Sequence, residues 1–138
     1  MESTALDAEL INAAFACAGA RGVDPAETFW TGYFDRHAGA RTRMLHMDEH
    51  MRGRMLASVY DLLLISDAQE ERRFLGFEIG NHDAYGAEAS MYDALFESLG
   101  EALEDACGAA WEPAWTDAWQ RRTRHLRQQI ADIARRTA

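Results

Sequence analysis

The sequence predicts an all-α domain of about six to seven helices. Apolar residues recur at helical spacing along nearly the whole chain, and no segment shows the sustained apolar–polar alternation of a strand. Glycine or proline stands at several breaks between the periodic segments. The 138 residues suffice for one compact domain, and a hydrophobic content of 48% favours a folded chain. We therefore expect residues 1–138 to form a single domain without internal repeats.

The first two helices are predicted on either side of a glycine break. One runs roughly over 6–20, and Gly22 interrupts it. Asp24–Glu27 is a helix start, with a cap residue, a proline at the first position and an acid in the first turn. The second helix follows and ends at a break or short turn over 38–40. The residues expected on the inward sides are Leu6, Leu10, Ala14 and Phe15 in the first helix, and Phe29, Trp30, Tyr33 and Phe34 in the second.

Two further helices are predicted before a tyrosine–glycine turn at 85–86. One spans about 48–65, and Ser66-Asp67 closes it and caps the next helix, which extends to His82. The apolar residues that define these helices are Met51, Met55, Val59 and Leu62 in the earlier one, and Phe74, Leu75 and Ile79 in the later one.

The last two helices are long and strongly patterned. One is predicted over 88–107 and is stopped by Gly108, and the other begins at Glu112-Pro113. Their inward residues are expected to be Met91, Tyr92, Leu95, Phe96, Leu99 and Leu103, and Trp115, Trp119, Leu126, Ile130 and Ile133.

Charge and cysteine content narrow the possible partners. A formal net charge of −9 argues against non-specific binding to nucleic acid or to an anionic membrane. Basic residues collect over 121–136, which we interpret as a solvated helix face. Cys17 and Cys107 stand without a Cys-x-x-Cys pair, so we expect reduced, largely buried thiols. The chain begins without the basic-then-apolar order of a signal peptide and has no membrane-length apolar run, which predicts a cytoplasmic protein.

One histidine stands where a helix gives way to a turn and another helix. Taken alone, His82 before that turn is more often a histidine that caps a helix end than a metal ligand, although neutral imidazole is the commonest protein ligand for transition metals. Three motifs surround it in order. They are Phe29-Trp30-x-x-Tyr33-Phe34, His82-x-x-x-Gly86 with a tyrosine ten residues after the histidine, and Trp115-x-x-Ala118-Trp119. Their order and spacing resemble bacterial single-domain globins and the globin domain of flavohemoglobins, over about 29–119.

The resemblance implies a globin-like fold around a heme pocket, with heme b as cofactor and His82 as the proximal iron ligand. The other residues that it places near heme are Phe29, Trp30, Met44, Leu45, Met51, Arg54, Met55, Ser58, Tyr85 and Tyr92. Arg54 best fits the position that usually holds histidine or glutamine on the distal side. A register shifted by two residues would instead turn Arg52 and Leu56 inward. Either arginine could bind a heme propionate or a ligand, or point to water.

Two positions depart from the family pattern. Glu78, one turn before His82, replaces an apolar residue and could approach the ligand or a heme edge, or stay in solvent. In the family, the tyrosine that matches Tyr92 works with a glutamate of the last helix, and none is evident over 128–134. Tyr92 is therefore either a partner of the imidazole or a core aromatic.

The resemblance further implies binding of a diatomic gas, O2, NO or CO, by a carrier or sensor. The chain has no room for a flavin or nicotinamide domain, so turnover would need an external reductase. The unusual residues Trp30, Arg54 and Glu78 keep open a heme enzyme, peroxidase-like, NO dioxygenase-like or oxidising a small molecule. A heme-free globin-like interaction module is a further alternative.

A rival metal motif lies upstream. His46-Met47-Asp48-Glu49-His50 matches the inverted zinc-protease signature His-x-x-Glu-His. That signature needs another acidic ligand and a substrate cleft, so we interpret the match as chance, although His50 could still approach the distal pocket.

Overall fold

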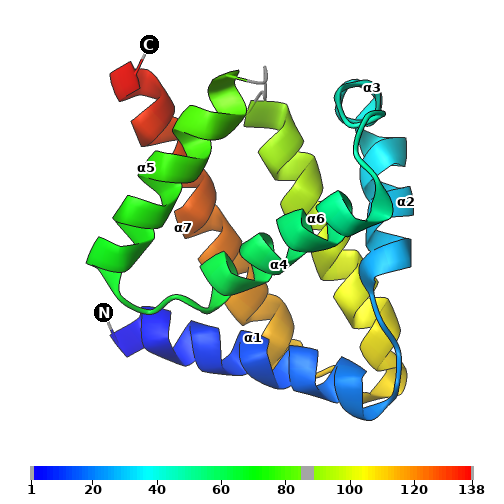
Figure 1. The fold of residues 1–138 in the computed structure, drawn as a ribbon. Helices are drawn as coiled ribbons and strands as arrows, with labels where there is room; N and C mark the ends of the chain where they lie inside the picture. The colour runs from blue at the N-terminus through cyan, green and yellow to red at the C-terminus, as the bar shows by residue number, and fades with distance from the viewer. Residues whose placement is uncertain (1, 85–88, 138) are drawn as a thin grey trace.

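The computed structural model describes residues 2–84 and 89–137, with side-chain surroundings for 6–78 and 89–136. Within these residues the chain forms seven α-helices and one short 3₁₀ helix, and no strand (Figure 1). The elements are α1 (Glu2–Ala20), α2 (Ala26–Arg36), α3 (Ala38–Arg43), α4 (Glu49–Leu64), α5 (Ala68–Ala84), α6 (Ala89–Cys107), η1 (Gly108–Ala110) and α7 (Pro113–Thr137). The all-α prediction of six to seven helices is confirmed. The predicted turn at 85–86 and the predicted helix start at Glu88 lie outside the described residues.

The predicted helix boundaries are mostly confirmed by their caps. Asp48 Oδ1 accepts a hydrogen bond from the backbone N–H of Met51 at 2.8 Å and starts α4. Asp67 Oδ1 accepts from the backbone N–H groups of Gln69 and Glu70, as the cap of α5 requires. Gly108 ends α6 with a φ of 57°, a left-handed conformation that other residues rarely adopt.

Two boundaries differ from the predictions. The first helix begins at Glu2, a turn before the predicted start. Residues 38–43 form the helix α3 where a break or short turn was predicted. Its cap is His37, whose Nδ1 accepts from the backbone N–H of Ala40 at 3.1 Å. Histidine is not among the usual cap residues, so capping patterns do not predict a helix start here.

The helices pack in pairs that are far apart in sequence. α1 lies against α7, α4 and α6, while α2 lies against α6. The last helix also packs against α5 and α6. α4 and α5 follow each other through a short connection but leave that corner in different directions (Figure 1). The long α6 and α7 therefore form the centre, and α4 and α5 are the arms of an open angle.

The core follows the predicted stripes of the last two helices and corrects those of α1 and α4. Leu6 and Met51, predicted inward, are 53% and 44% exposed. In α1 the buried stripe is shifted by one residue and runs through Asp7, Ile11, Ala14 and Ala18. Asp7 fits there because its carboxylate accepts hydrogen bonds from Arg121, the shorter at 2.8 Å. The ion pair with Arg121 thus buries Asp7, whereas the apolar pattern of the sequence had predicted that Leu6 turns inward.

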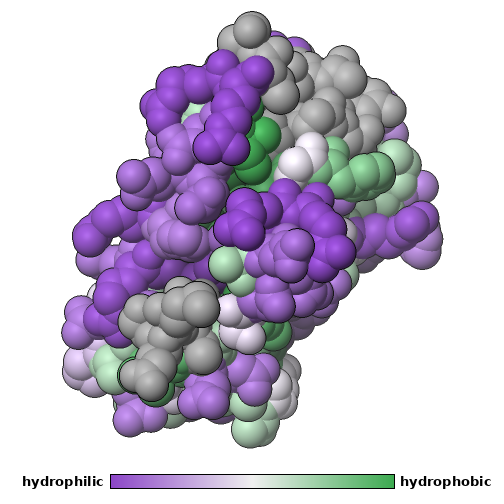
Figure 2. All heavy atoms as spheres, turned by 90° about the vertical axis from the view of Figure 1, so that its left-hand side faces the viewer, coloured by the Kyte–Doolittle hydropathy of each residue, from purple (hydrophilic) through white to green (hydrophobic). Residues whose placement is uncertain are grey.

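The face formed by α5 with the ends of α1 and α7 is largely hydrophilic, with only small separate apolar areas (Figure 2). None of the helices in the described part of the chain is both long and apolar enough to cross a membrane.

Candidate functional site

The two registers considered for α4 differ in which of its side chains turn inward. Leu56 is buried and Arg52 is half-buried, whereas Arg54 is exposed. The structure therefore favours the shifted register, in which Arg52 and Leu56 turn inward. Arg54, the position first favoured, points to solvent.

Arg52 holds a buried donor without an acceptor among the described residues. Its Nε is sealed from water and makes no hydrogen bond. Two turns further along α4, the hydroxyl of Tyr60 is in the same condition. Burial raises the pKa of Tyr60 to about 12, with Asp24 adding to the shift, so this hydroxyl stays protonated at neutral pH. Tyr60 packs against Phe15 of α1 at a ring-centroid distance of 4.6 Å.

The aromatic residues of α2 form one packed cluster. Phe29 is fully buried and its ring stacks on Tyr33 at 5.5 Å, while the half-buried Trp30 meets Phe29 edge-on at 4.8 Å. Burial raises the pKa of Tyr33, and Tyr92 of α6 raises it further. Tyr92 is thus a half-buried neighbour of Tyr33 that packs on the core. Sequence reasoning did not single out Tyr33 as a site residue, although it stands one turn from Trp30 on the same helix.

The remaining predicted distal residues are spread between surface and interior. Met44 and Met55 are half-buried and pack against the core, whereas Leu45 is 74% exposed. Ser58 is half-buried, and its hydroxyl donates to the carbonyl oxygen of Arg54 at 3.2 Å. Met51 is the partly exposed residue described above.

The proximal residues can be placed only in part. His82 lies in α5, but its side chain lies outside the described residues, and Tyr85 lies outside them entirely. The inward row of the preceding turns is Glu71, Leu75 and the half-buried Glu78. Glu78 is therefore not the fully solvated side chain that one alternative required.

A buried ion pair holds the corner where α4 ends and α5 begins. Arg122 of α7 and Glu71 of α5 are 2% and 3% exposed, and Arg122 Nη1 donates to Glu71 Oε1 at 2.5 Å. The same guanidinium donates to the backbone carbonyl oxygens of Leu62, Leu63 and Ile65 at 2.8–3.2 Å. These carbonyls belong to the end of α4, where a helix leaves acceptors unpaired. One side chain therefore connects three helices.

The burial of Arg122 corrects the interpretation of 121–136 as a solvated face. The sequence spacing of Arg122 already indicated that this side chain is buried. Arg122 stands between Trp119 and Leu126 in the inward row of α7, three residues after one and four before the other. An arginine in an apolar row, in a chain rich in acids, indicates a buried partner.

His125 completes this cluster at its edge. Its Nε2 lies 2.8 Å from Glu71 Oε2, the oxygen that does not accept from Arg122 Nη1. The side chain of His125 is 41% exposed, so it closes the solvent side of the pair.

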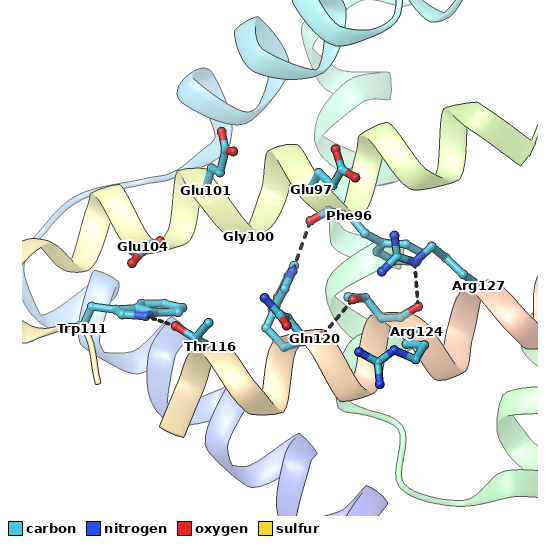
Figure 3. A pocket seen from close by; sticks show the side chains of 12 residues that line it. Phe96, Glu97, Gly100, Glu101, Glu104, Trp111, Thr116, Gln120, Arg124 and Arg127 are labelled. Atoms are coloured by element: carbon cyan, nitrogen blue, oxygen red, sulfur yellow. Dashed lines mark hydrogen bonds between the residues drawn. The ribbon is translucent and has the colours of Figure 1, made fainter. Parts of the chain in front are cut away.

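A hollow of about 330 Å³ lies between α6 and α7 (Figure 3). Acidic residues border it on α6 and basic residues on α7, and Trp119 forms part of its wall. Arg36 forms ion pairs with two of the acids, Glu97 and Glu101. None of the residues predicted to contact heme lines this hollow, so it is distinct from the candidate site on α4 and α5.

The rival zinc motif is not assembled. His46 lies in the turn before α4, and Glu49 and His50 lie in its first turn, all exposed. The part of the chain that the structure describes contains no group of three or more histidine, cysteine or acidic side chains able to hold a metal ion.

Comparison with known proteins identifies no relative: no family model matches the chain, and no curated protein matches it at a significant level.

Proposed function

We propose that this protein is a globin-like heme protein that binds heme b through His82 and takes up a diatomic gas, as a carrier or sensor. The proposal rests on the ordered motifs around His82 and on one structural observation, the unpartnered Nε of Arg52. A buried donor left without an acceptor costs about 1–3 kcal/mol. An acceptor brought by a bound molecule accounts for its retention.

The described residues suit the chemistry of heme. Heme is a flat apolar ring with two carboxylates at its edge, and α4 carries the guanidinium of Arg52 and the thioethers of the exposed Met51 and the half-buried Met55. Arg52 would donate to a carboxylate or to the bound gas, since a guanidinium only donates.

In this proposal α4 and α5 carry the residues on the two sides of the heme. The helices share a corner that Arg122 fixes, and they diverge from it (Figure 1). His82 belongs to α5, and in this proposal it is the residue that binds the iron. When bound, heme iron supplies an open coordination position for O2, NO or CO. An external reductase would keep the iron ferrous.

Hemin titration of the purified protein tests the proposal. We expect an intense Soret band, a CO-dependent shift in the ferrous state, and loss of the band's axial-histidine character in His82→Ala. His50→Ala, which removes an exposed histidine of α4, is the matched control and should leave the spectrum unchanged.

Other outcomes distinguish the alternatives. A spectrum without a Soret band of bound heme after hemin addition would contradict the proposal and favour a heme-free interaction module. Rapid turnover of peroxide, or of NO with a reductant, would instead favour a heme enzyme. An unchanged spectrum in His82→Ala would move the ligand to another residue.

A further inference from the structure

The two cysteines of the chain meet where the end of α1 packs on the end of α6. Cys107 Sγ donates to the backbone carbonyl oxygen of Ala14 at 3.3 Å, and Arg21 Nε donates to that of Ala106 at 3.1 Å. Cys17 lies on α1 between Ala14 and Arg21, so it occupies the stretch of α1 that faces Cys107. Cys17 is one turn of α1 beyond Ala14, the residue whose carbonyl oxygen accepts from Cys107 Sγ, and it lies near enough to Cys107 to raise the pKa of that thiol. Both cysteines are free thiols.

The two thiols differ in access to solvent. Cys107 is completely buried, whereas Cys17 is half-buried. Burial, with a smaller effect of the neighbouring Cys17 thiol, raises the pKa of Cys107 to about 11. Since the thiolate is the reactive form, Cys107 is protected and Cys17 is the group that a small oxidant reaches first.

We propose that Cys17 and Cys107 are a redox-modification site, at which hydrogen peroxide converts the two thiols into an intramolecular disulfide that joins α1 to α6. This inference is independent of heme binding, because it uses residues from neither α4 nor α5.

The chemistry balances with peroxide as the only co-reactant. The Cys17 thiolate attacks one peroxide oxygen, the O–O bond breaks, and a sulfenic acid and one water result. The Cys107 sulfur then attacks the sulfenic sulfur, forms the S–S bond and expels the hydroxyl, which leaves as the second water with the Cys107 proton. Two sulfurs are oxidised and one peroxide is reduced to two waters. The proximity of the two thiols compensates for the low thiolate fraction of Cys107.

The test uses the full-length protein, purified without added hemin and treated with a moderate excess of hydrogen peroxide. We expect an intact mass lower by two hydrogen atoms, loss of both free thiols, and one cross-linked peptide pair that contains residues 17 and 107. A dithiol reductant should restore both thiols. Helical circular dichroism before and after treatment establishes that the reaction occurs in the folded protein.

Two variants test the order of the steps. In Cys107→Ser, Cys17 should accumulate as a sulfenic acid that dimedone traps, whereas in Cys17→Ser the buried Cys107 should remain a thiol. A disulfide-linked dimer, a sulfinic acid at Cys17 beside a reduced Cys107, or two unchanged thiols in the wild-type protein would each overturn the inference. The wild-type measurement decides the matter even where a variant fails to fold.

Discussion

Arg122 on α7 donates a hydrogen bond to Glu71 on α5 in a place almost entirely excluded from water. The Nε and Nη2 groups of the same guanidinium donate to the backbone carbonyl oxygens at the end of α4. Because α4 and α5 are the arms of the candidate site, this pair fixes the point from which both arms extend.

Replacing Arg122 with methionine should be strongly destabilising. The substitution leaves the Glu71 carboxylate buried without its cation and the end of α4 without donors, at a cost of about 3–5 kcal/mol. Urea unfolding followed by circular dichroism measures it. Arg124→Met, which truncates an exposed arginine of the same helix, is the matched control with a change below about 0.5 kcal/mol. Equal losses in the two variants would show that the buried pair has no special role.

Two glycines should respond to alanine in opposite directions. A Cβ at Gly100 of α6 would lie 2.5 Å from Nε1 of the buried Trp119, whose indole donates to the Phe96 carbonyl oxygen. Gly100→Ala should therefore cost about 1–3 kcal/mol through overpacking. Gly76 of α5 has nothing within 4 Å of such a Cβ, so Gly76→Ala should stabilise by about 0.5–1 kcal/mol. Thermal unfolding of both proteins gives the comparison, and a neutral Gly100→Ala would contradict the close approach of Trp119.

The contribution of the Asp67 cap of α5 to the free energy of unfolding should depend on pH. Hydrogen bonds from the backbone N–H groups of Glu70 and Gln69 hold the pKa of Asp67 below its ordinary value of 3.8. Because the folded-state pKa is the lower one, the contribution is fully present above the ordinary value and is lost as pH falls through the folded-state pKa. Asp67→Asn should thus be less stable than the wild type near neutral pH, and the difference should shrink in acid. Urea unfolding across that range tests it, with the exposed Asp61→Asn on α4 as the control.

Substitutions of Arg52 and of Arg54 should have different effects on stability and on heme binding. Arg52→Leu removes the unpartnered buried Nε, so it should raise the free energy of unfolding of the heme-free protein by about 1 kcal/mol. If the guanidinium serves bound heme, the same change should speed heme loss to an apoprotein acceptor or the dissociation of the bound gas. Arg54→Leu, on the exposed side of α4, should change neither quantity. Identical behaviour of the two variants would exclude Arg52 from the site.

Local sequence signals predicted most of the helix boundaries because their causes are local. Asp48, Asp67 and Gly108 act on the backbone within a turn of their own position, so their effect does not depend on the rest of the fold. The start of α3 was missed because His37 is an unusual cap. Helical periodicity likewise predicted the inward rows of α6 and α7, whose stripes are wide and apolar.

The sequence motifs predicted which segments carry the candidate site but not which of their side chains turn inward. Motif spacing singled out His82, yet the choice between Arg52 and Arg54 depended on the rotation of α4, which a weakly patterned helix does not reveal. Cys17 and Cys107 are far apart in sequence and come near each other only where α1 packs on α6, so no spacing could indicate their proximity.

By itself the sequence determined an all-α chain, most of its helix ends and the inward rows of its last two helices, since these depend on local capping and on a 3.6-residue period. Only the tertiary structure decided which polar groups are buried. Arg122, Glu71 and Asp7 read as surface charges along the chain, and they enter the interior because a partner from a distant helix offsets the cost of removing each charge from water.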